Sequence, residues 1–310
     1  MKHREIVFVW ACLVLVSIGF SKTENFPVLK GPYLGQKPPG KTPEIFASGI
    51  ISTDKRELNA VFSPEGDEFY YAVYTPEPVN KCTIMVSRQV KGFWTKPETA
   101  SFSGKFIDVD MAFSPEGNRL YFCSIRPDQP GSTPGTKHDI WFCSRKKDNH
   151  WSEPVKLSPL INSSESETYP TFTRKRRMYF AAIRKEGMGG KDIYYSEQIK
   201  GKFLKPVNIG NAVNTRYDEG DTFVAPDESY LVISSRGRPD SIGGSDFYVS
   251  FKRKDDQWST PKNMGKPINT EIYEYCPMVS PDGKYFFFSR FSEGKSDIYW
   301  VDARVIEEMK

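Results

Sequence analysis

Short apolar runs separated by turns divide most of the chain into candidate strands. The runs are rich in aromatic and β-branched side chains, and clusters of Gly, Pro, Ser and Asp lie between them. This pattern is typical of half-buried β-strands. Stretches rich in Ala, Glu and Lys with a helical period are absent, and only residues 305–310 are expected to form a helical turn. The pattern predicts an all-β fold.

A hydrophobic strand that runs into a turn recurs five times along the chain. Three copies keep a Ser-Pro-acid-Gly turn, which begins at Ser63, Ser114 and Ser280, and two degraded copies begin at Thr173 and Ala225. The turns follow one another at intervals of 51, 59, 52 and 55 residues. A WD-type propeller blade has roughly 40 to 45 residues, so longer loops would account for the difference. We number these repeats one to five from the N-terminus.

Each repeat continues with the same order of features. An aromatic strand follows the turn, then a loop rich in Gly or Pro, then a third strand that begins with an acid in four repeats. An aromatic residue and a proline three positions later end repeats one to four, and such a proline marks an edge strand because it cannot donate to a ladder. We expect the acids to accept backbone N–H groups of the preceding loop. The acids are Asp139, Asp192, Asp246 and Asp297, and the prolines are Pro97, Pro154, Pro206 and Pro261.

Repeat five stops after its third strand, at residues 300–302, and has no outer strand of its own. Near the N-terminus, Pro43 precedes Glu44 to Phe46 in the pattern of an outer strand. We therefore expect a five-bladed β-propeller of four-stranded antiparallel blades, in which an N-terminal strand closes the last blade and removes a free edge. The predicted organisation is a signal peptide (1–21), a linker (22–40) and the propeller (41–310).

The N-terminus has the features of a secretory signal. Lys2 and Arg4 precede an apolar run over residues 6–20, and Gly19 and Ser21 provide small residues for cleavage. The run is short for a membrane span, so we expect no transmembrane segment in the mature chain. An exported protein, periplasmic or at the cell surface, is predicted. A lipid anchor at Cys12 and a retained N-terminal anchor stay open as alternatives.

Charge and cysteine content exclude some classes of partner and scaffold. The formal net charge is +4, and removal of a leader with net charge +1 leaves +3, which gives no reason to expect nucleic-acid binding. Four cysteines remain, Cys82, Cys123, Cys143 and Cys276, too few for a disulfide scaffold. A bridge between Cys123 and Cys143 is geometrically conceivable, but we favour two buried thiols.

The repeats resemble the WD-like, TolB-type propeller repeat of exported bacterial proteins, whose units read as a Ser-Pro-Asp-Gly turn, an aromatic strand and Asp-Ile-Tyr. The resemblance covers residues 40–302. It implies a propeller that serves as an interaction platform in the cell envelope, although the same repeat also accompanies enzymes as an accessory domain. The chain departs from the pattern at residues 174–176, in the third turn, and at Cys82-Thr83, in the loop of repeat one.

An acid stands six residues before the turn position in every repeat, and an arginine follows the second strand in four repeats, with Tyr74 in repeat one. In a propeller both positions open on the same face, so we expect the acids to ring one mouth of the central channel and the arginines to meet them there. The candidate binding residues are Glu57, Asp108, Glu167, Glu219, Glu274, Arg126, Arg184, Arg236 and Arg290.

These residues have two interpretations. In the structural one, which we favour, each arginine binds a carboxylate of its own or the next repeat and fixes the blades. In the functional one, carboxylates without a partner converge on the channel and hold a cation or the basic group of a partner. The loop at 127–137, unique to repeat two, is either a specificity loop or merely flexible.

Signatures of catalysis are sparse. After residue 21 the only histidines are His138 and His150, and the sequence has no zinc-type Cys or His spacing, no Gly-x-Ser-x-Gly and no phosphate loop. We expect a monomeric binding module that presents its channel face to a protein, peptide or glycan, without a cofactor other than a cation in the channel. The alternative is a carbohydrate-active hydrolase or lyase, sialidase-like or another glycosidase, that uses two rim carboxylates.

Overall fold

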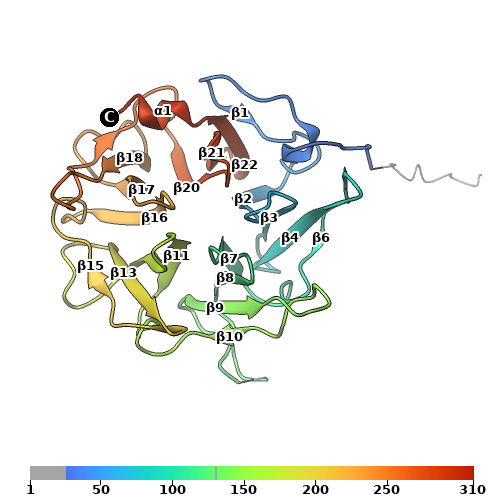
Figure 1. Ribbon diagram of the computed structural model, residues 1–310, viewed down its shortest axis with the longest axis horizontal. Coiled ribbons are helices and arrows are strands. Elements are labelled where there is room, and N and C mark those ends of the chain that lie inside the picture. Colours follow the sequence, from blue (N-terminus) through green and yellow to red (C-terminus); the bar gives the residue numbers. More distant parts are fainter. Residues whose placement is uncertain (1–25, 130) are drawn as a thin grey trace, which may run out of the picture.

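The computed structural model describes residues 26–129 and 131–310, and the predicted signal peptide lies outside them. Antiparallel sheets of mostly short strands stand around a common centre (Figure 1). Helical structure in this part of the protein is limited to η1 (Tyr33–Gly35) and α1 (Arg304–Glu307). The prediction of an all-β fold made of sheets of about four strands is confirmed.

Each sequence repeat contributes an inner, a second and a third strand in that order. The inner strands are β2 (Arg56–Phe62), β7 (Asp108–Phe113), β11 (Glu167–Phe172), β16 (Asp218–Val224) and β20 (Tyr273–Val279). The second strands are β3 (Glu68–Thr75), β8 (Arg119–Ser124), β12 (Arg177–Ala182), β17 (Tyr230–Arg236) and β21 (Tyr285–Ser292). The third strands are β4 (Lys81–Val90), β9 (Asp139–Ser144), β13 (Asp192–Ile199), β18 (Asp246–Phe251) and β22 (Lys295–Asp302).

The outer strands have two residues each, and a proline comes directly before every one of them. They are β1 (Glu44–Ile45), β6 (Glu98–Thr99), β10 (Val155–Lys156), β15 (Val207–Asn208) and β19 (Lys262–Asn263). Two further short strands, β5 (Phe93–Trp94) and β14 (Lys202–Phe203), pair with the ends of β4 and β13. Since a proline has no N–H to donate, it limits how far the outer edge can pair, as the sequence predicted.

The strands form one nine-stranded sheet and three smaller sheets. The large sheet contains the strands of repeats one and five, which a single parallel pair between Arg56 and Ser296 connects. The strand that pairs with the outer side of β22 is β1, with Glu44 opposite Trp300 and Ile45 opposite Tyr299. Residues near Pro43 therefore lie beside the last strand of the described residues, although the intervening sequence forms the rest of the ring (Figure 1).

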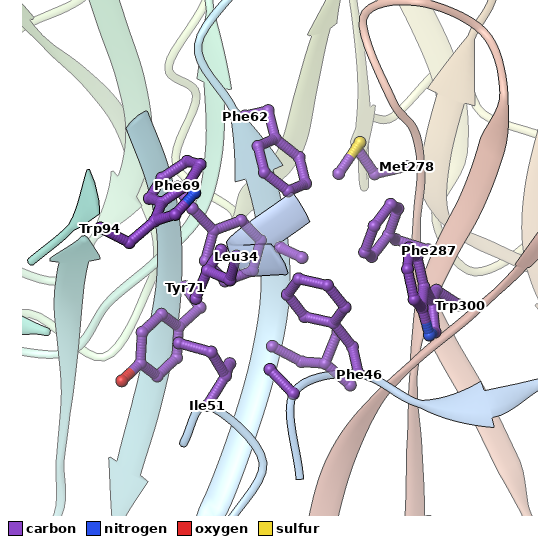
Figure 2. Close-up of a cluster of buried hydrophobic side chains, with 13 residues drawn as sticks. Leu34, Phe46, Ile51, Phe62, Phe69, Tyr71, Trp94, Met278, Phe287 and Trp300 are labelled. Carbon is purple, nitrogen blue, oxygen red and sulfur yellow. The ribbon is translucent and has the colours of Figure 1, made fainter. Parts of the chain in front are cut away.

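The N-terminal segment is packed into the core between repeats one and five. Phe46 is 0% exposed and its ring lies 5.3 Å from that of Phe69, 5.1 Å from Phe287 and 5.0 Å from Trp300, centroid to centroid. Figure 2 shows Phe46 between side chains of the two repeats. Buried aromatic area on this scale is a main source of stability in a domain. The segment thus stabilises the contact between the two ends of the protein.

Residues 26–40, expected as a linker, also contact the body of the protein. Leu34 is buried in the same cluster, and the indole Nε1 of Trp94 donates to the carbonyl of Gly31 at 2.7 Å. Across the described residues, no helix has the length and apolar character needed to cross a membrane.

Candidate binding site at the channel mouth

The five acids of the repeats are buried at 0–1% exposure. Four of them accept two hydrogen bonds, from the backbone N–H and the hydroxyl of the residue four positions earlier: Thr53 for Glu57, Ser163 for Glu167, Thr215 for Glu219 and Thr270 for Glu274. Asp108 instead accepts from the hydroxyls of Ser103 and Ser124, each at 2.7 Å. Each carboxylate therefore fastens the connection that leads into its inner strand, inside its own repeat.

Arginines pair with four of these acids. Arg126 lies 2.7 Å from Asp108, Arg184 3.5 Å from Glu167 and Arg290 2.8 Å from Glu274, nitrogen to oxygen. In repeat four the partner of Glu219 is Arg238, at 2.8 Å. The pairing expected for Arg236 is wrong: this residue binds Asp218 at 2.8 Å and is 56% exposed, because the backbone turns at Gly237 and carries the next arginine inward.

The expected ring of carboxylates at the channel mouth is also not what the structure contains. Burial keeps all five acids from solvent, and arginines of the same repeats compensate the charge of four of them, all but Glu57. Burial raises the pKa of Glu167 to about 7, and hydrogen bonds from Ser163 act in the opposite direction. Of the nine candidates, only Arg236 lines the pocket at the mouth that is described below.

The acids that begin the third strands behave as predicted in two repeats. Asp192 accepts the N–H of Met188, and Asp246 accepts the N–H groups of Ile242 and Gly243. Asp139 pairs with Lys156 and Asp297 with Lys295, so in repeats two and five a lysine takes the place of the loop N–H groups. The prediction of a loop acceptor is confirmed for Asp192 and Asp246 only.

The four cysteines of the described residues are all free and buried. Cys123 and Cys143 lie on neighbouring strands but in different register, with Ile140 opposite Cys123 and Leu120 opposite Cys143. The interpretation as buried thiols is confirmed.

The interior of the channel is built at a bulge in each inner strand. The register shifts at this point in all five, and the residue two positions after the acid lies there. These residues are Asn59, Asp110, Tyr169, Asp221 and Cys276. Four of them have positive φ, which is uncommon outside glycine and turns the residue away from the regular pleat.

These bulge residues connect different repeats, one to two, four to five and three to five. Asn59 accepts the N–H of Met111 at 2.7 Å, Asp221 accepts the N–H of Cys276 at 2.9 Å, and the hydroxyl of Tyr169 contacts the sulfur of Cys276. Because backbone polar groups must find partners away from water, these contacts hold the centre of the ring together. The bulge residues thus form a polar layer that links the inner strands.

Two carboxylates and one lysine dominate the electrostatics of this layer. Burial, followed by the negative charge of Asp221, raises the pKa of Asp110 to about 7, and Lys191 opposes the shift. Burial also raises the pKa of Asp221, again with Lys191 acting in the other direction. Two like charges in a buried site cannot both ionise freely. The Asp110 carboxyl is therefore partly protonated near neutral pH. Among the residues that the structure describes, no three His, Cys, Asp or Glu side chains are placed to hold a metal ion.

A pocket of about 430 Å³ opens above this layer on the face of the acid-bearing loops. Its wall combines charged, hydroxyl and aromatic groups: Lys191, Asp218, Asp221, Ser234, Arg236, Ser245, Tyr273, Tyr275 and Phe291, with Gly220. Tyr273 is exposed, and the hydroxyl of Tyr275 shares a hydrogen bond with Ser296. A concave site with aromatic surface and a few convergent polar groups is the usual form of a ligand site.

Sequence reasoning missed most of this pocket. Lys191 stands directly before the Asp of the third strand, where the other repeats have Cys82, His138, Ser245 and Ser296. Asp221 stands two residues after the repeated acid, at a position that also varies. The available signal was therefore variation between repeats next to the repeated positions, because the repeated residues serve the scaffold.

The pKa of Asp110 leads to a prediction for Asp110→Asn. In the folded protein the carboxyl titrates near pH 7, and in the unfolded chain near 3.8, so its contribution to stability is full below about pH 4 and is lost as the pH rises to about 7. The variant should be more stable than wild type by about 1 to 3 kcal/mol at pH 8 and equal to it at pH 4. Urea unfolding across this pH range measures the difference. Asn59 occupies the matching bulge with positive φ, so asparagine fits the backbone.

An exposed acid provides the control for this measurement. Asp54→Asn should follow the wild-type curve throughout, since Asp54 lies on the surface. A pH dependence unchanged by Asp110→Asn would contradict the assignment of a buried proton to this layer.

Comparison with solved structures identifies the fold. TolB from Acinetobacter baumannii aligns with 81% of this protein and 55% of its own length, with a TM-score of 0.50 and 15% sequence identity. The fold is a TolB-type β-propeller. This protein therefore spans little more than half of the length of that TolB.

Two other solved structures share the propeller fold. A complex of BT0996 and RGII aligns with 88% of this protein and 91% of its own length, with a TM-score of 0.54 and 12% identity. A structure described as a glycoside hydrolase aligns with 89% and 92%, with a TM-score of 0.54 and 11% identity. At such identities the similarity concerns the fold, which hosts many functions. No sequence-family model matches the protein. No curated protein matches it in sequence.

Proposed function

We propose that this TolB-like propeller is an exported, monomeric binding module of the cell envelope, whose ligand is a peptide segment of a protein or a glycan held in the pocket at the channel mouth. The proposed domain arrangement is a signal peptide (1–21), an N-terminal segment (22–40) and the propeller (41–310). The location rests on the sequence of the leader and on the likeness to TolB.

We also infer five blades, with the nine-stranded sheet counted as two. A single parallel pair, Arg56 with Ser296, connects its halves, whereas the strands within each half form long antiparallel ladders. In this arrangement β1 is the outer strand of the fifth blade, beside β22. A ring closed in this way has no free edge between the first and the last repeat.

The observation that carries the binding function is the composition of the mouth pocket. Tyr273 offers exposed aromatic surface, Arg236 and Asp218 form an accessible ion pair, and Lys191 adds a second cation. Aromatic rings contact sugars and peptide side chains at small entropic cost, and charged groups at the wall fix orientation. Arg236 is the one rim candidate that we retain as a ligand contact at the mouth, since the other eight form hydrogen bonds or ion pairs within their repeats.

Removal of the contacts at the mouth tests this proposal. A ligand is first found by screening labelled wild-type protein on arrays of peptides and oligosaccharides, and its affinity is then measured by isothermal titration calorimetry. Tyr273→Ala and Arg236→Ala should each weaken binding about tenfold or more, because loss of a central anchor costs roughly 1 to 2 kcal/mol.

The matched control is Arg253→Ala. Arg253 is also 56% exposed and binds Asp255 at 2.7 Å, but it lies away from the pocket. Equal affinity of this variant and wild type is expected. If Arg236→Ala and Tyr273→Ala also bind like wild type, the mouth is not the ligand site.

The alternative activity, a carbohydrate-active hydrolase or lyase, has one observation in its favour. Asp221 lines the pocket, and its neighbour Asp110 has a pKa raised to about 7, in the range of a general acid. An oligosaccharide turnover screen with wild type and Asp221→Asn decides this. Product that disappears in the variant would establish the enzyme and displace the binding module.

A further inference from the structure

Repeat one has an acid without an arginine. Glu57 is buried and accepts the N–H and hydroxyl of Thr53, at 3.2 and 2.6 Å. It forms no ion pair with any residue of 26–129 or 131–310, unlike its four counterparts. Leaving a buried carboxylate uncompensated is costly, and burial accordingly raises the pKa of Glu57.

The other four repeats define what a guanidinium does beside this acid. In each, the arginine also donates to the carbonyl of the residue six positions before the acid. These carbonyls belong to Phe102, Ile161, Val213 and Ile268. The corresponding residue of repeat one is Ile51, which follows the pocket-lining Ile50. Each site thus provides two acceptors for the planar guanidinium group, a carboxylate and a backbone carbonyl.

The same four guanidinium groups lie over aromatic rings. Arg126 lies 4.8 Å from the ring of Phe122, Arg184 5.6 Å from Phe180 and Arg290 5.3 Å from Phe288. In repeat four, Arg238 lies 4.7 Å from the ring of Tyr248 on the third strand. Such contacts add to the binding of a guanidinium group.

Strand register shows which residues of repeat one surround the equivalent position. Val73 is opposite Glu57, so Thr75 corresponds to Arg126 and Arg184, each two residues after the partner of its acid. Tyr71 is opposite Met85, as Phe122 is opposite Trp141. The ring of Tyr71 is therefore present, whereas a short threonine replaces the arginine.

The position beside Glu57 adjoins a cavity, and the Glu57 side chain at its wall is 1% exposed. A pocket of about 470 Å³ is lined by Glu57, Tyr71, Val73, Thr75 and Met85, and by residues 26–27 of the N-terminal segment. Its wall also carries Lys55 and Lys96, both exposed and neither paired with Glu57 in the described residues.

We propose that this pocket, which we call the repeat-one pocket, binds an arginine side chain of a partner polypeptide. The guanidinium would reach Glu57 and the carbonyl of Ile51 together and lie against Tyr71. A lysine has one charged point and cannot form the same fork. The partner segment carries an isolated arginine, because Lys55 and Lys96 would repel a run of basic residues. This inference does not depend on the site at the channel mouth.

The probe is the peptide acetyl-Gly-Arg-Gly-amide, titrated into the full-length protein by isothermal titration calorimetry and by NMR. Peptides with citrulline or lysine in place of arginine are the ligand controls. We expect saturable binding of the arginine peptide, at least tenfold weaker binding of the lysine peptide, and no measurable binding of the citrulline peptide, which lacks the charge.

Two variants test whether the probe peptide binds in the repeat-one pocket. Glu57→Gln keeps an acceptor for Thr53 but removes the charge, and should weaken binding at least tenfold. Thr75→Arg supplies the missing side chain from within, so it should abolish binding and raise the melting temperature. Glu65→Gln removes an exposed acid of the same repeat and should change neither property.

The outcomes separate clearly. Absence of binding to wild type, or equal binding by wild type and Thr75→Arg, overturns the proposal. Because Thr75→Arg is expected to stabilise the protein, loss of binding in this variant cannot be attributed to unfolding. Arg253→Ala, which removes an exposed arginine that lines neither pocket, should bind the probe like wild type.

Discussion

Arg238→Ala is expected to lower the free energy of unfolding by about 3 to 5 kcal/mol, since it leaves the buried Glu219 without its counter-ion. Arg238 is 8% exposed at its side chain and donates to Glu219, to the hydroxyl of Ser235 and to the carbonyl of Val213. All three acceptors lose a partner at once. Equilibrium unfolding in urea, followed by tryptophan fluorescence, measures the loss.

Arg236→Ala is the matched control, two positions earlier at the end of β17. Its ion pair with Asp218 is largely exposed, and exposed pairs contribute about 0 to 1 kcal/mol. Arg238→Ala should therefore lose several kcal/mol more stability than Arg236→Ala. The repeat pattern alone predicts the reverse, because it places Arg236 next to the acid. Equal losses would contradict the assignment of Arg238 as the structural arginine.

Phe46→Ala should cost about 3 to 5 kcal/mol, the range for removal of a large buried aromatic side chain. The ring of Phe46 contacts side chains from both β3 and β22, so its loss opens a cavity between the first and the last repeat. Thermal and urea unfolding report the change.

Ile45→Ala, one residue earlier, tests whether the effect belongs to the buried ring or to the strand. Ile45 is 40% exposed and lies in the short strand β1. A loss below about 1 kcal/mol is expected for this surface position. A comparable loss in both variants would mean that the pairing of β1, and not the packing of Phe46, holds the segment.

Much of the fold could be predicted from the sequence because short local motifs determine its turns and strands. Three short motifs each predict a local backbone conformation: the turn of Ser, Pro, acid and Gly, the aromatic strand, and the proline before an outer strand. Because the motifs recur along the sequence, each repeat supports the interpretation of the others. Even the partner of β22 could be predicted, since repeat five lacked an outer strand and Pro43 preceded a spare one. No such repetition exists for residues 26–40, whose packing through Leu34 was not anticipated.

The candidate site was harder to predict because it depends on the path of each loop and on how deeply each acid is buried. The four structural arginines reach their acids from different offsets: Arg290 lies directly opposite Glu274, Arg126 two residues past the opposite position, and Arg238 three residues past it after a turn at Gly237. A sequence count cannot distinguish these paths. The sequence also cannot show whether an acid is exposed at the channel mouth or buried inside a blade, since in both cases the acid stands at the start of the inner strand.

The central layer illustrates a further limit. A bulge changes which side of a strand faces the axis, and the residues at the bulges, such as Asp110 and Tyr169, differ between repeats. The sequence contains these residues but not the register shift that brings them together. The raised pKa values of Asp110 and Asp221 therefore became apparent only from the arrangement in space.

The position of β1 next to β22 has a consequence for biosynthesis. A ribosome releases β1 before β22, so β1 must wait for its partner until the strands of all five repeats have emerged. The earlier repeats can form their hairpins meanwhile, whereas Phe46 cannot pack until Phe287 and Trp300 of repeat five are present. Maturation should thus finish in one late step that depends on contacts distant in sequence, and a nascent polypeptide stalled before residue 295 should remain open to proteolysis near Phe46.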